Sequence, residues 1–156
     1  RFTISTVGLV PMIRKFAAEQ RQINLAISLH AANDTLRSFL LPINRKYPIA
    51  QLIQACKEYI AQTNRRITFE WALIQDVNDS PQHAQELANL IKGLLCHVNL
   101  IPLNPTRQYP ANGSTRQRAA DFSAILERVG IPCTIRIRRG IDIQAGCGQL
   151  ASHQQA

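Results

Sequence analysis

Apolar residues follow two periodicities along this chain, and the two alternate from one end to the other. Short apolar runs bounded by polar or turn residues predict β-strands, and they cover residues 2–5, 23–30, 67–74, 97–103 and 132–138. Between them, apolar residues recur three and four positions apart, as in amphipathic helices, and these segments cover residues 7–20, 49–62, 79–95 and 114–129. The pattern therefore predicts strands that alternate with helices.

Local signals fix where two of these helices begin or end. Ser80 precedes Pro81 at the start of the third helix, and this pair is typical of an N-cap followed by the first helical position. Gly130 follows the last helix, as expected for a C-terminal stop. We therefore expect the last strand to start directly after Gly130.

The alternation predicts an α/β fold with parallel strands joined by right-handed helical connections. The strands are apolar almost throughout, which is typical of a sheet buried on both faces. Four or five strand-helix units are too few to close an eight-stranded barrel, so the chain is either an open part of one or lacks strands that precede it. Because Arg1 opens on a strand pattern without an initiator Met, we favour the second and expect a fragment.

The composition is that of a soluble globular domain, since 46% of the 156 residues are hydrophobic and 18% are charged. The apolar stretches are too short to span a bilayer and no secretory signal opens the chain, so we expect a cytoplasmic protein without membrane contact. Eighteen Lys and Arg against ten Asp and Glu give a net charge of +8, which favours a polyanionic partner such as nucleic acid.

The spacing of the four cysteines matches neither a CxxC zinc pattern nor a dense disulfide scaffold, so reduced thiols are expected. Cys56 falls on the apolar face of its helix, and Cys96 and Cys133 also occupy core positions of the pattern. Cys147 differs, because the two glycines that flank it remove neighbouring side chains and let the backbone approach a ligand closely. We therefore expect the Cys147 thiol to be accessible to a ligand rather than packed in the core.

Polar residues follow the predicted strands at their carboxyl ends, where parallel α/β proteins bind ligands. Ser5 ends the first strand, the run Ser28-Leu29-His30 ends the second, the polar run at 75–79 follows the third, and Asn104 follows the fourth. Taken singly, each is more simply a cap, a turn former or a satisfied loop histidine. Because the strand ends share one edge, we expect the group to form a rim suited to a ligand with amino, carboxylate or ribose groups.

Three motifs resemble those of a known family: SLHA at 28–31, LIPLNP at 100–105 and RRGIDIQAGCGQL at 138–150. They resemble the radical S-adenosylmethionine (SAM) ribosomal RNA adenine methyltransferases, and the likeness covers the C-terminal part of that family's chain. It implies that residues 1–150 form the C-terminal part of a radical-SAM partial (β/α) barrel, with 151–156 as a tail. The implied reaction is methylation of adenine carbon 2 in 23S rRNA and also in tRNA.

The resemblance also implies roles for single residues. Cys147 would be the catalytic cysteine that carries the methyl group. The SAM-binding residues would be Ser5, Ser28, Leu29, His30 and Asn104. The family's 4Fe-4S cluster is held by a CxxxCxxC motif that this sequence lacks, so no metal ligand is predicted here and we expect the fragment to be inactive by itself. Gly146 stands where the family usually has a second alanine before the cysteine, a change of one methyl group that leaves the sulfur in place.

Three alternatives stay open: a related branch that methylates carbon 8, a cysteine-nucleophile barrel enzyme without radical chemistry, and a non-catalytic basic RNA-binding module. Two groups of arginines would flank an RNA at the rim, at positions 107, 116 and 118 and at positions 136, 138 and 139. Arg65 and Arg66 lie at the opposite end of a strand and are predicted to form a solvated turn.

Overall fold

A computed structural model of the chain describes residues 2–104 and 111–136. Within these residues, five parallel strands form one sheet in the order β1-β2-β3-β4-β5. Their bounds are Thr3–Thr6 (β1), Asn24–Ser28 (β2), Ile67–Leu73 (β3), Cys96–Pro102 (β4) and Cys133–Ile135 (β5). The predicted α/β fold with parallel strands is confirmed, and every strand begins within one residue of its predicted start.

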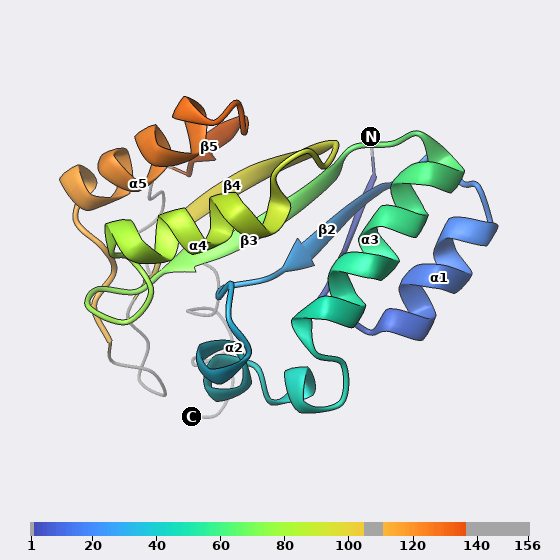
Figure 1. Ribbon diagram of the computed structural model, residues 1–156, viewed down its shortest axis with the longest axis horizontal. Helices are drawn as coiled ribbons and strands as arrows, with labels where there is room; N and C mark the ends of the chain where they lie inside the picture. The colour runs from blue at the N-terminus through green and yellow to red at the C-terminus, as the bar shows by residue number, and fades with distance from the viewer. Residues whose placement is uncertain (1, 105–110, 137–156) are drawn as a thin grey trace, which may run out of the picture.

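The helices connect successive strands and pair with one another. They are Val10–Ala18 (α1), Asp34–Leu40 (α2), Ile49–Thr63 (α3), Pro81–Ile91 (α4) and Arg116–Arg128 (α5), with a 3-10 helix at Pro42–Arg45 (η1). Figure 1 shows α1 beside α3 near β1 and β2, and α4 beside α5 at the other end of the sheet. One continuous apolar core joins both helix pairs to the strands.

The predicted helix ends are confirmed with one small correction. The Ser80 hydroxyl accepts from the amide of His83 and caps α4, and Gly130 follows α5 with a φ of 78° that favours glycine. Helix α5 does not begin at Ser114, since Thr115 is its N-cap and accepts from the amide of Arg118.

Helix α2 and η1 were not predicted, and the reason lies in their burial pattern. The buried residue of α2 is Arg37, so the helix turns a charged side chain inward where the usual pattern turns an apolar one. Phe39, by contrast, is 74% exposed. Asn33 supplies the start signal, because its Oδ1 accepts from the amide of Leu36 at 2.8 Å.

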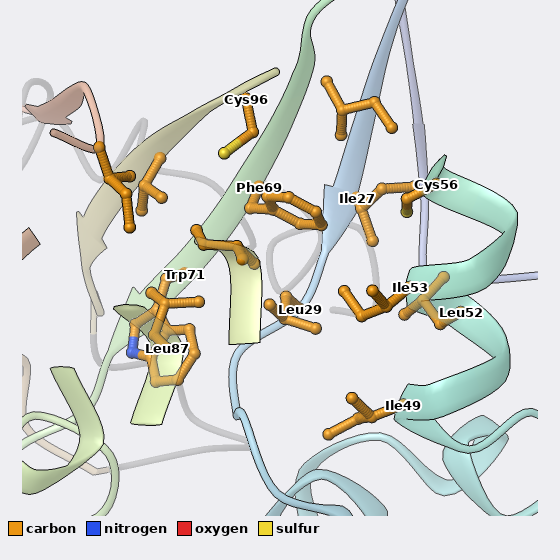
Figure 2. Close-up of a cluster of buried hydrophobic side chains, with 14 of the residues drawn as sticks. Ile27, Leu29, Ile49, Leu52, Ile53, Cys56, Phe69, Trp71, Leu87 and Cys96 are labelled. Atoms are coloured by element: carbon orange, nitrogen blue, oxygen red, sulfur yellow. The ribbon is translucent and has the colours of Figure 1, made fainter. Parts of the chain in front are cut away.

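The core lies between the sheet and the helices. Ile67, Phe69, Trp71 and Leu73 alternate along β3 and are all buried, while the residues between them are half-buried. Burial of such side chains contributes roughly 1.5–3 kcal/mol each. Figure 2 shows Phe69 and Trp71 among aliphatic side chains of β2 and of the helices.

The expectation that the sheet is buried on both faces was wrong for β3. Thr68, Glu70 and Ala72 face away from the helices, and they stay half-buried because the described helices pack against the other face of the sheet. The alternation of polar and apolar residues in ITFEWAL therefore indicates a strand with one buried face and one half-buried face. No helix in residues 2–104 or 111–136 is long and apolar enough to cross a membrane.

A candidate cofactor-binding rim at the strand ends

The residues predicted to bind a cofactor lie at the carboxyl ends of three strands. Ser5 is in β1 and exposed, Ser28 ends β2 and is half-buried, and His30 follows two residues later. Asn104 is half-buried and lies just beyond β4. Because the strands are parallel, these residues share one edge of the sheet, as the sequence predicted.

His30 is held on both sides by main-chain and side-chain contacts. Its Nδ1 accepts a hydrogen bond from the amide of Ala72 at 2.9 Å, so the proton of the neutral ring resides on Nε2. Burial lowers the pKa of His30 to about 4, and the nearby charge of Arg37 adds to this effect. At neutral pH the ring is uncharged and offers an Nε2–H donor.

Leu29 takes a different place from its neighbours. Its side chain is fully buried in the apolar core, where Figure 2 shows it near Phe69 and Ile53. Its amide donates to the carbonyl of Glu70 at 3.0 Å and its carbonyl accepts from Arg37 Nε at 3.1 Å. Leu29 thus anchors the run, while Ser28 and His30 are its half-buried polar members.

Asn78 ties the end of β2 to the end of β3, a role that its place among the polar residues after the third predicted strand does not specify. The residue is fully buried. Its Nδ2 donates to the carbonyls of His30 and Ala72 at 2.8 and 2.7 Å, and its Oδ1 accepts from the amide of Ile74 at 2.8 Å. One amide side chain therefore satisfies three main-chain groups where the strand ladder stops.

A second buried group holds the segment after β3 against the start of α5. Asp79 accepts from the hydroxyl of Ser114 at 2.7 Å and from the amide of Asp76 at 3.0 Å. Arg118 reaches both carboxylates, at 3.1 Å from Asp79 Oδ1 and 2.6 Å from Asp76 Oδ1. Arg118 was predicted to flank an RNA, but these ion pairs neutralise its charge locally, whereas Arg116 is exposed.

The open face of the sheet carries polar side chains in register below the rim. Ser28 is paired with Glu70, Glu70 with Asn99, and Asn99 with Thr134 across four strands. His97 Nε2 lies 2.7 Å from the Thr134 hydroxyl, so this face is connected by hydrogen bonds as well as by register. The alternate polar positions in the sequences of β3 and β4 are the pattern from which this polar face could have been predicted.

The cysteines that the structure describes are unsuited to nucleophilic chemistry. Cys56 and Cys96 are buried, as predicted, and Figure 2 shows both among apolar side chains. Burial raises the pKa of Cys56 to about 12 and that of Cys96 to about 11. Cys133 is half-buried, and burial raises its pKa as well. Cys147, the predicted methyl carrier, lies outside the described residues.

No group of three potential metal ligands occurs in residues 2–104 and 111–136. These residues therefore do not fit a 4Fe-4S cluster. The rim does fit a polar organic ligand, since it combines serine hydroxyls, a neutral imidazole donor and an asparagine amide.

Solved structures share this fold. A radical SAM methyltransferase from Sphaerobacter thermophilus is 56% identical, with a TM-score of 0.92 over 96% of this chain and 44% of that chain. A domain of a pyruvate-formate lyase-activating enzyme from Bacteroides vulgatus shares the fold at 18% identity, with a TM-score of 0.65 over 86% of this chain and 80% of that chain. Fold and rim together define the class: part of a radical-SAM α/β barrel.

Curated relatives narrow the class to one family. A protein of Caldanaerobacter subterraneus, named "Probable dual-specificity RNA methyltransferase RlmN", is 55% identical over 95% of this chain and 43% of its own length. A Roseiflexus protein of the same name is 51% identical over 96% of this chain and 40% of its own. The chain belongs to this radical SAM methyltransferase family and spans less than half the length of these relatives. No protein-family model matches it.

Proposed function

We propose that this chain is the C-terminal part of a radical SAM RNA methyltransferase that methylates carbon 2 of an adenine in 23S rRNA and in tRNA. One observation carries the proposal: in a chain 55% identical to a protein named as an RNA methyltransferase, the residues assigned to SAM fall along one strand-end edge. The net charge of +8 supports a nucleic acid partner.

The rim would hold SAM through complementary polar groups. SAM carries a carboxylate, ribose hydroxyls and an adenine, and these groups require both donors and acceptors. Ser5, Ser28 and Asn104 supply both kinds, and His30 supplies an Nε2–H donor. Because His30 is neutral at pH 7, it adds no repulsion toward the cationic sulfonium of SAM. When bound, SAM supplies the methyl group and, with a cluster present, the radical chemistry of the family.

Cys147 would accept the methyl group. Its thiolate would form a bond to the methyl carbon as the bond from that carbon to the sulfonium breaks, and the thiol proton would leave to solvent. Arg136, which is exposed at the end of β5, together with the arginines at 138 and 139 would favour the thiolate. The thiols of the described residues are less suited to this role, because burial raises the pKa of each.

The cluster would be held by a part of the relatives' sequence that this chain does not span. The described residues supply no ligand set for it, and the sequence contains no CxxxCxxC motif. We therefore infer that the 156 residues by themselves do not methylate RNA and that activity requires the longer chain.

Nucleoside mass spectrometry of RNA tests this function. We expect 23S rRNA and tRNA from cells that lack the gene to lose a methyladenosine that cells with the gene contain, and the full-length gene to restore it. The position of the methyl group, at carbon 2 or carbon 8, separates the two branches of the family. RNA with identical methyladenosine content in both strains would overturn the proposal and favour the thiol enzyme or the RNA-binding module.

A further inference from the structure

Arg37 is fully buried, although it belongs to a short helix near the surface. Its guanidinium donates four hydrogen bonds. Nη2 lies 2.7 Å from the carbonyl oxygen of Val7 and 3.2 Å from that of Ser28, and Nε lies 3.1 Å from that of Leu29. Nη1 donates to Oδ1 of Asn44 at 2.9 Å. Three of its four acceptors are therefore main-chain carbonyls.

Arg37 makes no ion pair with any described carboxylate. The hydrogen bonds connect Asp34 to Arg37 only indirectly, through Asn44, whose Nδ2 donates to Asp34 Oδ1 at 2.9 Å. Removing a charge from water is costly, and an apolar side chain of similar volume would fill this space without that cost. Packing alone therefore does not account for an arginine here.

The carbonyls that Arg37 binds lie just past the point where β1 and β2 stop pairing. The register between these strands ends at Thr6 and Ile27, and Val7 and Ser28 follow directly. Because a guanidinium is planar and its donors are fixed in one fork, it sets the separation of the two chains beyond the ladder.

Gly8 permits this close approach. Its φ is 104°, and a Cβ at this position would lie 3.2 Å from Arg37 Nη2 and 3.2 Å from both terminal methyl carbons of Leu52. The glycine after β1 and the arginine of α2 thus form one fitted contact, although 29 positions separate them in the sequence.

We propose that Arg37 is a positioning residue for SAM binding, which holds the segment that follows Ser5 at the end of β1 and the segment with His30 at the end of β2 at the separation that a ligand bridging both requires. The inference rests on the proposed function, because it assumes that SAM occupies the rim. Arg37 itself lies beneath the rim and need not touch the ligand.

The test uses the full-length protein with two substitutions and one control. Arg37→Met removes the charge and all four hydrogen bonds while keeping an unbranched apolar side chain. Arg37→Lys keeps the charge but loses the planar guanidinium with its fixed donors. Arg14→Met is the matched control, because Arg14 is partly exposed and pairs with Glu58 between α1 and α3, without a contact to the segments that Arg37 binds. SAM affinity is measured by calorimetry, and backbone hydrogen exchange without ligand is followed at residues 5–9 and 28–31.

We expect Arg37→Met to weaken SAM binding by about tenfold or more, the usual cost of removing a positioning partner, and to speed exchange in both segments. Arg37→Lys should lie between this variant and the wild type, and Arg14→Met should match the wild type. If Arg37→Met does not fold, the same two measurements on Arg37→Lys test the inference, and a smaller loss of SAM affinity is then expected. Wild-type affinity and wild-type exchange in the variant that folds would overturn the inference.

The two proposals fail in distinguishable ways. If the wild type binds no SAM while the Arg37 variants still speed exchange at both strand ends, the proposed function is contradicted and so is the role of Arg37 toward SAM. If the wild type binds SAM and the Arg37 variants bind it equally well, the proposed function stands and the positioning role alone is overturned.

Discussion

At the residue scale, His30 has a backbone conformation that is uncommon outside glycine, with a φ of 60°. Its own side chain helps to hold it there, because Nδ1 accepts from Ala72 while Asn78 binds its carbonyl. The contact with β3 also decides which ring nitrogen carries the proton. The donor at the rim is therefore set by the fold before any ligand arrives.

Replacement of His30 by Asn tests the neutral imidazole. Asn tolerates positive φ and its Oδ1 can accept from Ala72, but it does not titrate and has no group at the place of Nε2. The pKa of His30 in the folded protein, about 4, lies below its ordinary value of 6.5, so the unfolded chain binds more protons between these pH values. The contribution of His30 to stability is therefore complete above pH 6.5 and is lost as the pH falls toward 4.

Denaturant unfolding of the full-length wild type and His30→Asn over this pH range measures the effect. We expect the free energy of unfolding to fall by about 1–3 kcal/mol more in the wild type than in the variant. Burial also lowers the pKa of His97, but His97 is present in both proteins and cancels in the comparison. Parallel pH profiles would show that His30 is not held neutral.

The sequence predicts the polar residues of the rim but not the long-range roles of the buried ones, for a physical reason. Ser5, Ser28 and His30 follow from strand ends alone, which local apolar patterns fix. Arg37 and Asn78 act on partners 30 and 48 positions away, Val7 and His30, and no local pattern encodes such pairs. Asn78 is predicted only as one of the polar residues that follow the third strand, and Arg37 leaves no signal in the local pattern.

At the element scale, the segment between β3 and α4 is built around Asn78 and Asp79. Both side chains satisfy main-chain groups that the strand no longer pairs. The same region meets the start of α5 through Ser114 and Arg118. The ends of β2 and β3 and the segment before α5 are thus linked by buried hydrogen bonds as well as by apolar packing.

Asn78→Ala tests the contribution of this segment. The substitution leaves the carbonyls of His30 and Ala72 and the amide of Ile74 without their partner, so we expect a loss of about 2–4 kcal/mol in the free energy of unfolding. Asn89→Ala is the control, because Asn89 is exposed on α4 and should cost less than about 0.5 kcal/mol. Urea unfolding of both full-length variants measures the difference, and equal costs would contradict the role of Asn78.

Some elements are specified by their own local sequence pattern, and others depend on contacts with distant segments. The helices α1, α3, α4 and α5 have strong apolar faces and were predicted from spacing. Helix α2 was missed, because its burial depends on Arg37 and on the strand ends that Arg37 contacts. The open polar face of β3 was also misjudged, since a sheet covered on one face leaves the alternate positions half-buried.

At the scale of the whole molecule, the described strands form one side of an open barrel. β1 pairs with β2 alone among the described residues, and Phe2 beside it is 81% exposed. An edge of this kind accepts a further strand. The relatives are more than twice as long as this chain, so the proposed chemistry combines the rim and Cys147 with groups that these 156 residues do not contain.

The central claim, that Cys147 carries the methyl group, is tested most directly by the mass of the peptide that spans residues 141–150 in the full-length enzyme isolated from cells. We predict that this peptide gains the mass of one CH2 unit, the net change when a methyl group replaces the thiol hydrogen on the sulfur of Cys147. The Cys133 peptide is an internal control and should stay unmodified, because burial raises the pKa of that thiol. An unmodified Cys147 in enzyme that is methylating RNA would contradict the account.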